Sequence, residues 1–205
     1  MPKDGAATKE LILNSAQELV YERGFSATTL DLMLERAKLT KGAFFHHFKN
    51  KDDLALSLIE RYLDGESVLL NSLVERAEQL TRDPLQQVLI IIGFIIDDIK
   101  TGGALSKGCL FASYAFELAE FDENVRSLAR KGFTKWREVI GGKVAQAMEM
   151  YKPKLPVSSM DLTENMLAAF EGGIVIFRME GNPDIIAKSL SAFRNYVELL
   201  FDQRT

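Results

Sequence analysis

LTKGAFFHHFKNKDDL, residues 39–54, contains the features that decide the fold. Thr40 is suited to cap a helix N-terminus, and the residues after it predict a short helix over 41–48. The polar segment 50–53 then predicts the start of a much longer helix with apolar residues at helical spacing. A short helix and a long helix therefore follow each other with almost no connecting chain.

Positive charge is concentrated around this stretch. Between Arg36 and Lys51 the chain has five Lys or Arg, two His and no Asp or Glu, although the whole protein has a formal net charge of -4. Local basic charge on an acidic protein is typical of a surface that binds nucleic acid. The simpler alternative is an ordinary solvated helix face.

The residues before this stretch predict two further helices. Apolar spacing predicts a helix over 7–23, and Gly24 stands where such a helix would stop. Thr28 followed by Asp31 resembles a capping pair that opens a short helix ending near Ala37. Two short helices separated by two residues and preceded by a longer one have the lengths of a helix-turn-helix unit.

In such a unit the second short helix enters the major groove of DNA, so its outer face has to carry hydrogen-bond donors. Phe44 and Phe48 are four residues apart and should pack inward, while Phe45 and His46 project elsewhere. His46 and His47 lie about 100° apart on a helix, so they form a poor chelate and no metal site is expected.

The rest of the chain is also predicted to be helical. An Asp-Pro pair at 83–84 and an Asn-Pro pair at 182–183 each resemble an N-cap followed by proline, and Asp161 with Glu164 resembles a capping pair. The segment 152–159 is the clearest loop. The predicted helices are 84–100, 106–119, 122–151, 162–180 and 183–202. The sequence thus predicts an all-α fold with about nine helices.

Composition places limits on location and chemistry. The chain has 205 residues, of which 47% are hydrophobic and 26% charged, as in an ordinary globular protein. No segment resembles a secretion signal, and the apolar run 88–96 falls short of the roughly 20 residues that span a bilayer. We therefore expect a cytoplasmic protein with no membrane contact. A single cysteine, Cys109, excludes an internal disulfide framework, and no cofactor is expected.

The segment 28–54, with TTL at its start and LTKGAFFHHFKNKDDL at its end, resembles the DNA-binding signature of the TetR family of bacterial transcriptional repressors. The resemblance implies a helix-turn-helix domain over residues 1–50 and a regulatory domain over 51–205. It also implies a homodimer that binds near-palindromic, double-stranded operator DNA and leaves it when a small-molecule inducer binds. The residues that it implies at the DNA are Thr28, Thr29, Thr40, Lys41, Gly42, Ala43, Phe45, His46, His47 and Lys51.

Two positions depart from the family pattern. The family usually has Tyr at the position of Phe45, so one hydroxyl contact to phosphate is missing. It usually has Gly at the position of Lys38, where a turn with positive φ would impose a steric cost on lysine. Helix capping alone is an alternative explanation for Thr28 and Thr40.

Cys109 is the candidate sensor of the regulatory domain. Ser106 is predicted to cap the helix 106–119, which would place the thiol in the first turn beside Lys107, where a helix N-terminus and a cation favour thiolate. The runs KGCL and ELAEFDENVR resemble the repressor subgroup that includes NemR and AcuR, which implies sensing of electrophiles, oxidants or small acrylate-type molecules. The alternative is a small buried apolar residue.

Large apolar side chains in the regulatory domain form a candidate ligand pocket. Ordinary core packing is the alternative for each of them. With Cys109, the candidate residues are Phe111, Tyr114, Phe133, Trp136 and Phe170.

The last two helices, about residues 162–202, are predicted to form a four-helix dimer interface. Gly172 and Gly173 would let helices approach closely. The last helix carries an apolar stripe of Ile185, Ile186, Leu190, Phe193, Val197, Leu200 and Phe201. The alternative is that this stripe packs wholly inside one subunit.

An enzyme is the competing class of protein, but the chain has no Gly-rich loop after a strand and no GxSxG motif. We therefore expect no catalytic residues. A helical ligand-binding module without DNA activity is the other alternative, and the salt dependence of DNA binding separates it from a repressor.

Overall fold

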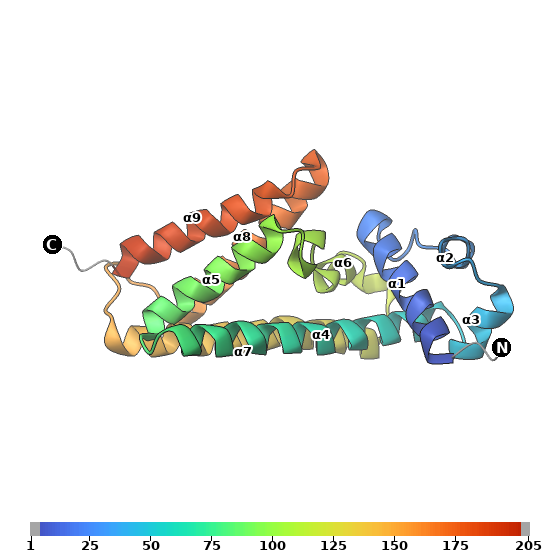
Figure 1. Cartoon of the computed structure of the whole chain (residues 1–205), viewed down its shortest axis with the longest axis horizontal. Helices are drawn as coiled ribbons and strands as arrows, with labels where there is room; N and C mark the ends of the chain where they lie inside the picture. Colours follow the sequence, from blue (N-terminus) through green and yellow to red (C-terminus); the bar gives the residue numbers. More distant parts are fainter. Residues whose placement is uncertain (1–4, 202–205) are drawn as a thin grey trace. The chain divides into compact units, whose positions relative to one another are not determined.

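The computed structural model describes residues 5–201, and every regular element in that range is a helix (Figure 1). Two short 3-10 helices, η1 (Ala104–Lys107) and η2 (Leu118–Glu120), flank the sixth α-helix. Residue 202, where the predicted last helix ends, lies outside the described residues. The nine α-helices within residues 5–201 are α1 (Gly5–Arg23), α2 (Leu30–Ala37), α3 (Lys41–His47), α4 (Lys51–Leu80), α5 (Pro84–Lys100), α6 (Leu110–Ala115), α7 (Glu123–Met150), α8 (Ser159–Glu180) and α9 (Asp184–Phe201). The prediction of an all-α fold is confirmed.

The chain forms two compact units. The first contains the chain up to Glu66 together with Leu110–Gly132, and the second contains Ser67–Cys109 and the chain from Phe133 onward. Helices α4 and α7 each contribute residues to both units. The first unit extends beyond the predicted domain of residues 1–50, because the start of α4 and the segment around α6 pack into the same core.

Helices α1, α2 and α3 pack around a small aromatic core in the first unit. Phe44 and Phe48 are each 1% exposed, and their ring centroids lie 5.4 Å apart. Both phenylalanines therefore point inward, as the helical spacing predicts. Burying a side chain of this size contributes about 1.5–3 kcal/mol, so the core fixes the direction in which α3 presents its outer face.

The turn between α2 and α3 contains Lys38 in the left-handed conformation, with φ 53° and ψ 44°. Among residues 5–201 it is the one residue other than glycine with positive φ. A side chain in this conformation costs about 1–2 kcal/mol, which is the steric cost expected from the departure at this position. The tight turn directly after α2 is maintained despite this cost.

In the second unit, α9 packs against both α5 and α8. Asp83 caps α5 as predicted, because its carboxylate accepts hydrogen bonds from the amides of Leu85 at 2.8 Å and Gln86 at 3.1 Å. Gly173 of α8 lies against α9, where an added Cβ would be 2.9 Å from the Cα atom of Ile186. Glycine at this position therefore allows the close approach of the two helices that the sequence predicts.

The cap predicted for α8 is wrong by one turn. Ser158 is the N-cap, its hydroxyl accepts from the amide of Asp161, and the Asp161 carboxylate accepts from the amide of Ser158. Asp161 is therefore the third residue of a capping box rather than the cap itself.

The apolar stripe of α9 packs mostly inside the subunit. Of its seven predicted members, six are buried in the single chain, and Ile185 is partly exposed. Most of the stripe thus packs inside the subunit, where α9 contacts α5 and α8, and dimerisation through the last two helices stays a prediction. Exposed apolar residues occur instead on α8, at Val175, Ile176 and Met179.

The single helix predicted over 106–119 is also wrong. Gly108 has φ 105°, which separates η1 from α6, and the chain breaks again before η2. Ser106 lies inside η1 and donates its hydroxyl to the carbonyl of Gly103 at 2.7 Å, so it does not cap a helix. Three short helical turns replace one regular helix.

Among residues 5–201, no helix combines the length and the apolar character that crossing a membrane would require.

Candidate DNA-binding and regulatory sites

Helix α3 is held at its start by Thr40, whose hydroxyl accepts a hydrogen bond from the amide of Ala43 at 3.3 Å. Lys41, Gly42, Phe45 and His46 are exposed on this helix. Ala43 and His47 are partly exposed. With Phe44 buried on the opposite face, the predicted contact residues of α3 share the accessible side.

The side chains on this face are ordered by contacts with one another. The rings of His46 and His47 lie edge to face with centroids 4.9 Å apart, and Phe45 stands edge-on to Phe44 at 5.4 Å. Phe45 is 55% exposed, which is unusual for so large an apolar residue on a monomer surface. The face combines donors with an exposed aromatic ring, which suits it to the edges and methyl groups of bases.

Lys41 forms an ion pair with Asp31, the acidic residue in the first turn of α2. Their Nζ and Oδ1 atoms are 3.0 Å apart, and the two side chains are 65% and 78% exposed. Lys41 has to give up this partner if it is to contact a phosphate or a base. If α3 contacts DNA, Asp31 is expected to oppose binding, because it holds Lys41 and adds a negative charge beside it.

We expect Asp31→Asn to strengthen binding to a selected duplex by about two- to fivefold, because an exposed ion pair is weak and the removed charge repels phosphate. Fluorescence anisotropy at fixed salt measures the change. Glu35→Gln on the same helix is the matched control, since it removes one negative charge without freeing Lys41. Equal effects of the two variants would show that only net charge matters.

The N-cap of α2 is Thr29 rather than the predicted Thr28. Thr29 is the N-cap of α2 and accepts from the amide of Leu32 at 3.3 Å. Thr28 is 1% exposed, and its hydroxyl donates to the carbonyl of Gly24 at 2.7 Å. The predicted capping pair of Thr28 and Asp31 is wrong by one residue, and the hydroxyl that faces solvent belongs to Thr29.

Lys51 points into the first unit rather than outward. Its Nζ donates to the carbonyls of Phe25 at 2.7 Å and Ser26 at 3.2 Å, and lies 4.4 Å from the centroid of the Phe25 ring. Burial lowers the pKa of the Lys51 ammonium, which the nearby carboxylate of Glu117 partly opposes. Lys51 thus holds the turn between α1 and α2.

Glu117 is the residue of this site that sequence reasoning missed. Its carboxylate accepts hydrogen bonds from the amides of Phe25 at 2.9 Å and Ser26 at 2.7 Å. Glu117 and the turn are more than 90 residues apart in the chain, and no local motif connects them. The one signal in the sequence is that Glu117 is a charged residue between two large apolar residues, Phe116 and Leu118.

Cys109 is 6% exposed and immediately precedes α6. The sequence predicts that Cys109 lies in the first turn of a helix capped by Ser106. In the structure it lies directly before the start of α6. Gly108 packs against α8, where an added Cβ would lie 3.4 Å from Ile174 and 3.8 Å from Nη2 of Arg178. The guanidinium of Arg178 is thus close to the chain at Gly108, the residue before Cys109.

The predicted aromatic pocket residues are divided between the two compact units. Phe111 and Tyr114 fill the core of the first unit, where the Phe111 ring lies 4.8 Å from that of Tyr62. Phe133, Trp136 and Phe170 belong to the second unit. Trp136 and Phe170 are buried and Phe133 is partly exposed. None of these residues lines the apolar cavity described next.

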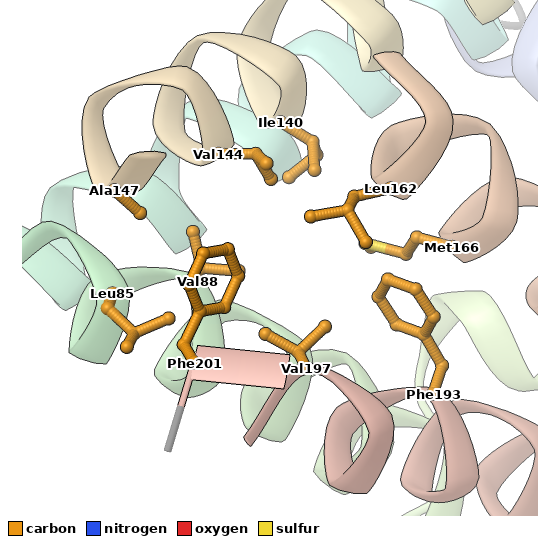
Figure 2. A pocket seen from close by; sticks show the side chains of 10 residues that line it. All are labelled: Leu85, Val88, Ile140, Val144, Ala147, Leu162, Met166, Phe193, Val197 and Phe201. Atoms are coloured by element: carbon orange, nitrogen blue, oxygen red, sulfur yellow. The ribbon is translucent and has the colours of Figure 1, made fainter. Parts of the chain in front are cut away.

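A small apolar cavity lies among α5, α7, α8 and α9 (Figure 2). Figure 2 shows the side chains pointing toward a common centre. They are Leu85, Val88, Ile140, Val144, Ala147, Leu162, Met166, Phe193, Val197 and Phe201. The enclosed space is about 10 Å³, whereas ligand pockets have about 300–1,000 Å³. A ligand enters this position only if the side chains move apart.

A wider, open depression of about 480 Å³ lies on the same unit and is lined mainly by polar side chains of α4, α5 and α7. Lys143 lies beneath it and donates to Glu78 at 2.5 Å and to Gln87 at 2.9 Å. Its charge is balanced inside the protein, so we interpret this cluster as structural. No group of three or more His, Cys, Asp or Glu suited to a metal ion occurs within residues 5–201.

Two family profiles match the chain. The profile described as bacterial regulatory proteins, tetR family, matches residues 12–58. The profile described as tetracyclin repressor-like, C-terminal domain, matches residues 84–193, which is more than half of the chain. The first match covers the helix-turn-helix unit, and the second covers α5 through most of α9.

Similar proteins include two named repressors or regulators. The HTH-type transcriptional repressor NemR of Escherichia coli K12 is 28% identical over 125 residues, which cover 61% of each chain. The transcriptional regulator AcuR of Cereibacter sphaeroides is 22% identical over 181 residues, which cover 88% of this chain and 81% of AcuR.

Solved structures share the fold. A TetR-family regulator from Agrobacterium tumefaciens has a TM-score of 0.81 at 20% identity, and the match covers 97% of this chain and 100% of that one. The reduced form of E. coli NemR has a TM-score of 0.72 at 19% identity, covering 92% and 96%. Together with the two profile matches, they establish that the chain belongs to the TetR family of bacterial transcriptional regulators.

Proposed function

We propose that the protein is a repressor that binds a near-palindromic operator as a homodimer and leaves it when an inducer or an electrophile acts on its regulatory part. The observation that carries this proposal is the outer face of α3, which is accessible, rich in donors and free of acidic residues between positions 36 and 51. Its residues would read the major groove while Thr29 and Thr40 meet the backbone.

Within this proposal the contact residues are Thr29 and the α3 face, and Thr28 and Lys51 act by shaping the turn that supports it. The DNA-binding segment would end near residue 50, where α4 begins. The remaining chain would hold the regulatory and dimerisation functions. Such a protein has no catalytic residues and acts in the cytoplasm, where its operator is.

The exposed side of α8 supports the dimer. Five exposed residues of small or apolar type lie on one face of this helix, within an arc of about 100°. They are Ala168, Gly172, Val175, Ile176 and Met179. Two copies that pair through α8 and the exposed side of α9 would form a four-helix interface and present two α3 helices to two half-sites.

The regulatory signal would enter at Cys109 or at the apolar cavity. A thiol directly before α6, next in the chain to a glycine that lies near the Arg178 guanidinium, is suited to react with electrophiles when the structure opens around it. A non-covalent inducer would have to expand the cavity in Figure 2. In both cases the signal shifts the protein toward a spacing of recognition helices that no longer fits the operator.

The test is fluorescence anisotropy with duplexes selected by the protein from a random-sequence library, before and after treatment with N-ethylmaleimide. We expect selective binding with a steep loss of affinity as salt increases, because phosphate contacts release counterions. Cys109→Ser should keep its binding after treatment, while the unmodified protein loses it. A helical module without DNA activity would select no duplex, and equal loss in both proteins would exclude Cys109 as the sensor.

A further inference from the structure

The turn formed by Phe25 and Ser26, between α1 and α2, is held from two sides by two charged side chains. The Glu117 carboxylate accepts hydrogen bonds from the amides of Phe25 and Ser26, at 2.9 and 2.7 Å, and from the Ser26 hydroxyl at 2.5 Å. Lys51 donates to both backbone carbonyls, at 2.7 and 3.2 Å. Every backbone polar group of these two residues is therefore bound by Glu117 or Lys51.

These contacts are stronger and more specific than ordinary turn hydrogen bonds. Each pairs an ionised side chain with a backbone group, and such bonds are about twice as strong as neutral ones. Phe25 itself is 4% exposed and its bond to Glu117 is part-buried, whereas the bonds of Ser26 are exposed. The arrangement fixes both the position and the orientation of the turn relative to Glu117.

Gly24 adds an independent observation. Its φ of 82° already favours glycine, and an added Cβ would overlap Oε1 of Glu117. The chain therefore approaches the carboxylate as closely as a backbone without a side chain permits. Glycine at this position allows the positive φ directly after α1 and leaves room for the Glu117 carboxylate.

Glu117 is itself held rigidly. It lies between α6 and η2, and its amide donates to the carbonyl of Tyr114 at 3.0 Å. Tyr114 is fully buried, its hydroxyl donates to the carbonyl of Ala55 at 3.3 Å, and its ring packs against Phe25 and Phe121. Burial raises the pKa of this phenol far above its ordinary value, so it remains a donor.

The six residues of α6 connect this anchor to Cys109. The thiol directly precedes α6, and Glu117 follows the helix by two residues. In the chain, the candidate sensor and the residue that holds the helix-turn-helix turn therefore stand on either side of α6.

We propose that Glu117 is a positioning residue, which sets the orientation of α2 and α3 by holding the turn between α1 and α2. The inference rests on the proposed function and names a residue outside the helix-turn-helix that supports its orientation. Lys51 holds the same turn through its two backbone carbonyls. Neither residue has to touch DNA to determine operator selectivity.

The experiment compares Glu117→Ala and Glu117→Gln with the unmodified full-length protein, using a duplex that the unmodified protein selects from a random library and a scrambled duplex. Glu117→Ala should weaken binding to the selected duplex by about tenfold or more, while binding to the scrambled duplex changes by less than about twofold. The affinity of Glu117→Gln for the selected duplex should lie between those of Glu117→Ala and the unmodified protein, because its amide oxygen still accepts a hydrogen bond.

Hydrogen exchange followed by mass spectrometry provides a readout that does not involve DNA. Peptides covering residues 24–30 should exchange faster in Glu117→Ala than in the unmodified protein, by about tenfold at the two held amides. The matched control is Glu120→Gln, which removes the same charge three residues further on. It should match the unmodified protein in both measurements.

Two results would overturn the proposal. One is Glu117→Ala behaving like Glu120→Gln in both measurements. The other is an equal loss of binding to both duplexes with a lower melting temperature, which indicates a merely structural role. If the unmodified protein selects no duplex, the repressor function fails separately, and exchange at residues 24–30 alone decides whether Glu117 holds the turn.

Discussion

Gly132→Ala should lower the free energy of unfolding by up to about 2 kcal/mol. A Cβ at this position of α7 would overlap the ring of Phe111, which is 1% exposed and stands edge-on to Tyr62. A buried aromatic ring cannot turn away as a flexible side chain would, so the surrounding core has to shift, and overpacking of this kind typically costs about 1–3 kcal/mol. The usual gain of about 1 kcal/mol for replacing a helical glycine by alanine offsets only part of this cost.

Gly142→Ala is the matched control, and its expected sign is opposite. Gly142 lies on the same helix, is exposed, and has no atom within 4 Å of an added Cβ. Alanine there should stabilise the protein by up to about 1 kcal/mol. Urea denaturation of both variants at one protein concentration measures the difference, since the stability of a dimer depends on concentration. Equal stabilisation by both substitutions would show that the Phe111 ring is not confined as described.

Ile176→Asp should convert the protein to monomers and weaken operator binding by about a hundredfold or more. Ile176 belongs to the exposed apolar face of α8 and is 45% exposed in the single chain. In a dimer paired through this face, two unpaired carboxylates would be buried close together, which is costly in both desolvation and repulsion. A palindromic operator then loses one of its two recognition helices per complex.

Leu155→Asp tests whether any exposed apolar-to-acid change has this effect. Leu155 is 53% exposed and lies in the connection between α7 and α8. Sedimentation equilibrium should find this variant dimeric and anisotropy should find its operator affinity within about twofold of the unmodified protein. A dimeric Ile176→Asp variant with normal affinity would exclude the α8 face as the interface.

The sequence predicts most helices of this fold well, and the reasons are local. The Asp83–Pro84 pair sets the start of α5 because a cap and a proline act within one turn. The short helices around residues 28–48 are found because capping threonines and inward-facing phenylalanines are spaced by the helical period. The exposed face of α3 follows from the same spacing.

The errors arise where long-range contacts decide the outcome. The apolar spacing over 106–119 is compatible with one helix, but the backbone at Gly108 and the attachment of Glu117 to a turn more than 90 residues away break it into pieces. The stripe of α9 is a similar case, because a pattern of apolar residues does not tell whether its partner is the same chain or a second copy. Thr28 and Thr29 are the same residue type, so the sequence does not tell which one caps α2. In the structure the Thr28 hydroxyl donates to the carbonyl of Gly24 instead.

The narrow cavity of the second unit has a consequence for how such a protein acquires new effectors. Because the space among α5, α7, α8 and α9 is about 10 Å³, an effector could enter there only in a form of the protein in which the lining side chains have moved apart. Its observed affinity is its intrinsic affinity reduced by the population of the open form. Substitutions that ease opening therefore tune sensitivity without touching the effector. Chemical selectivity and detection threshold can accordingly evolve through different residues of the same core.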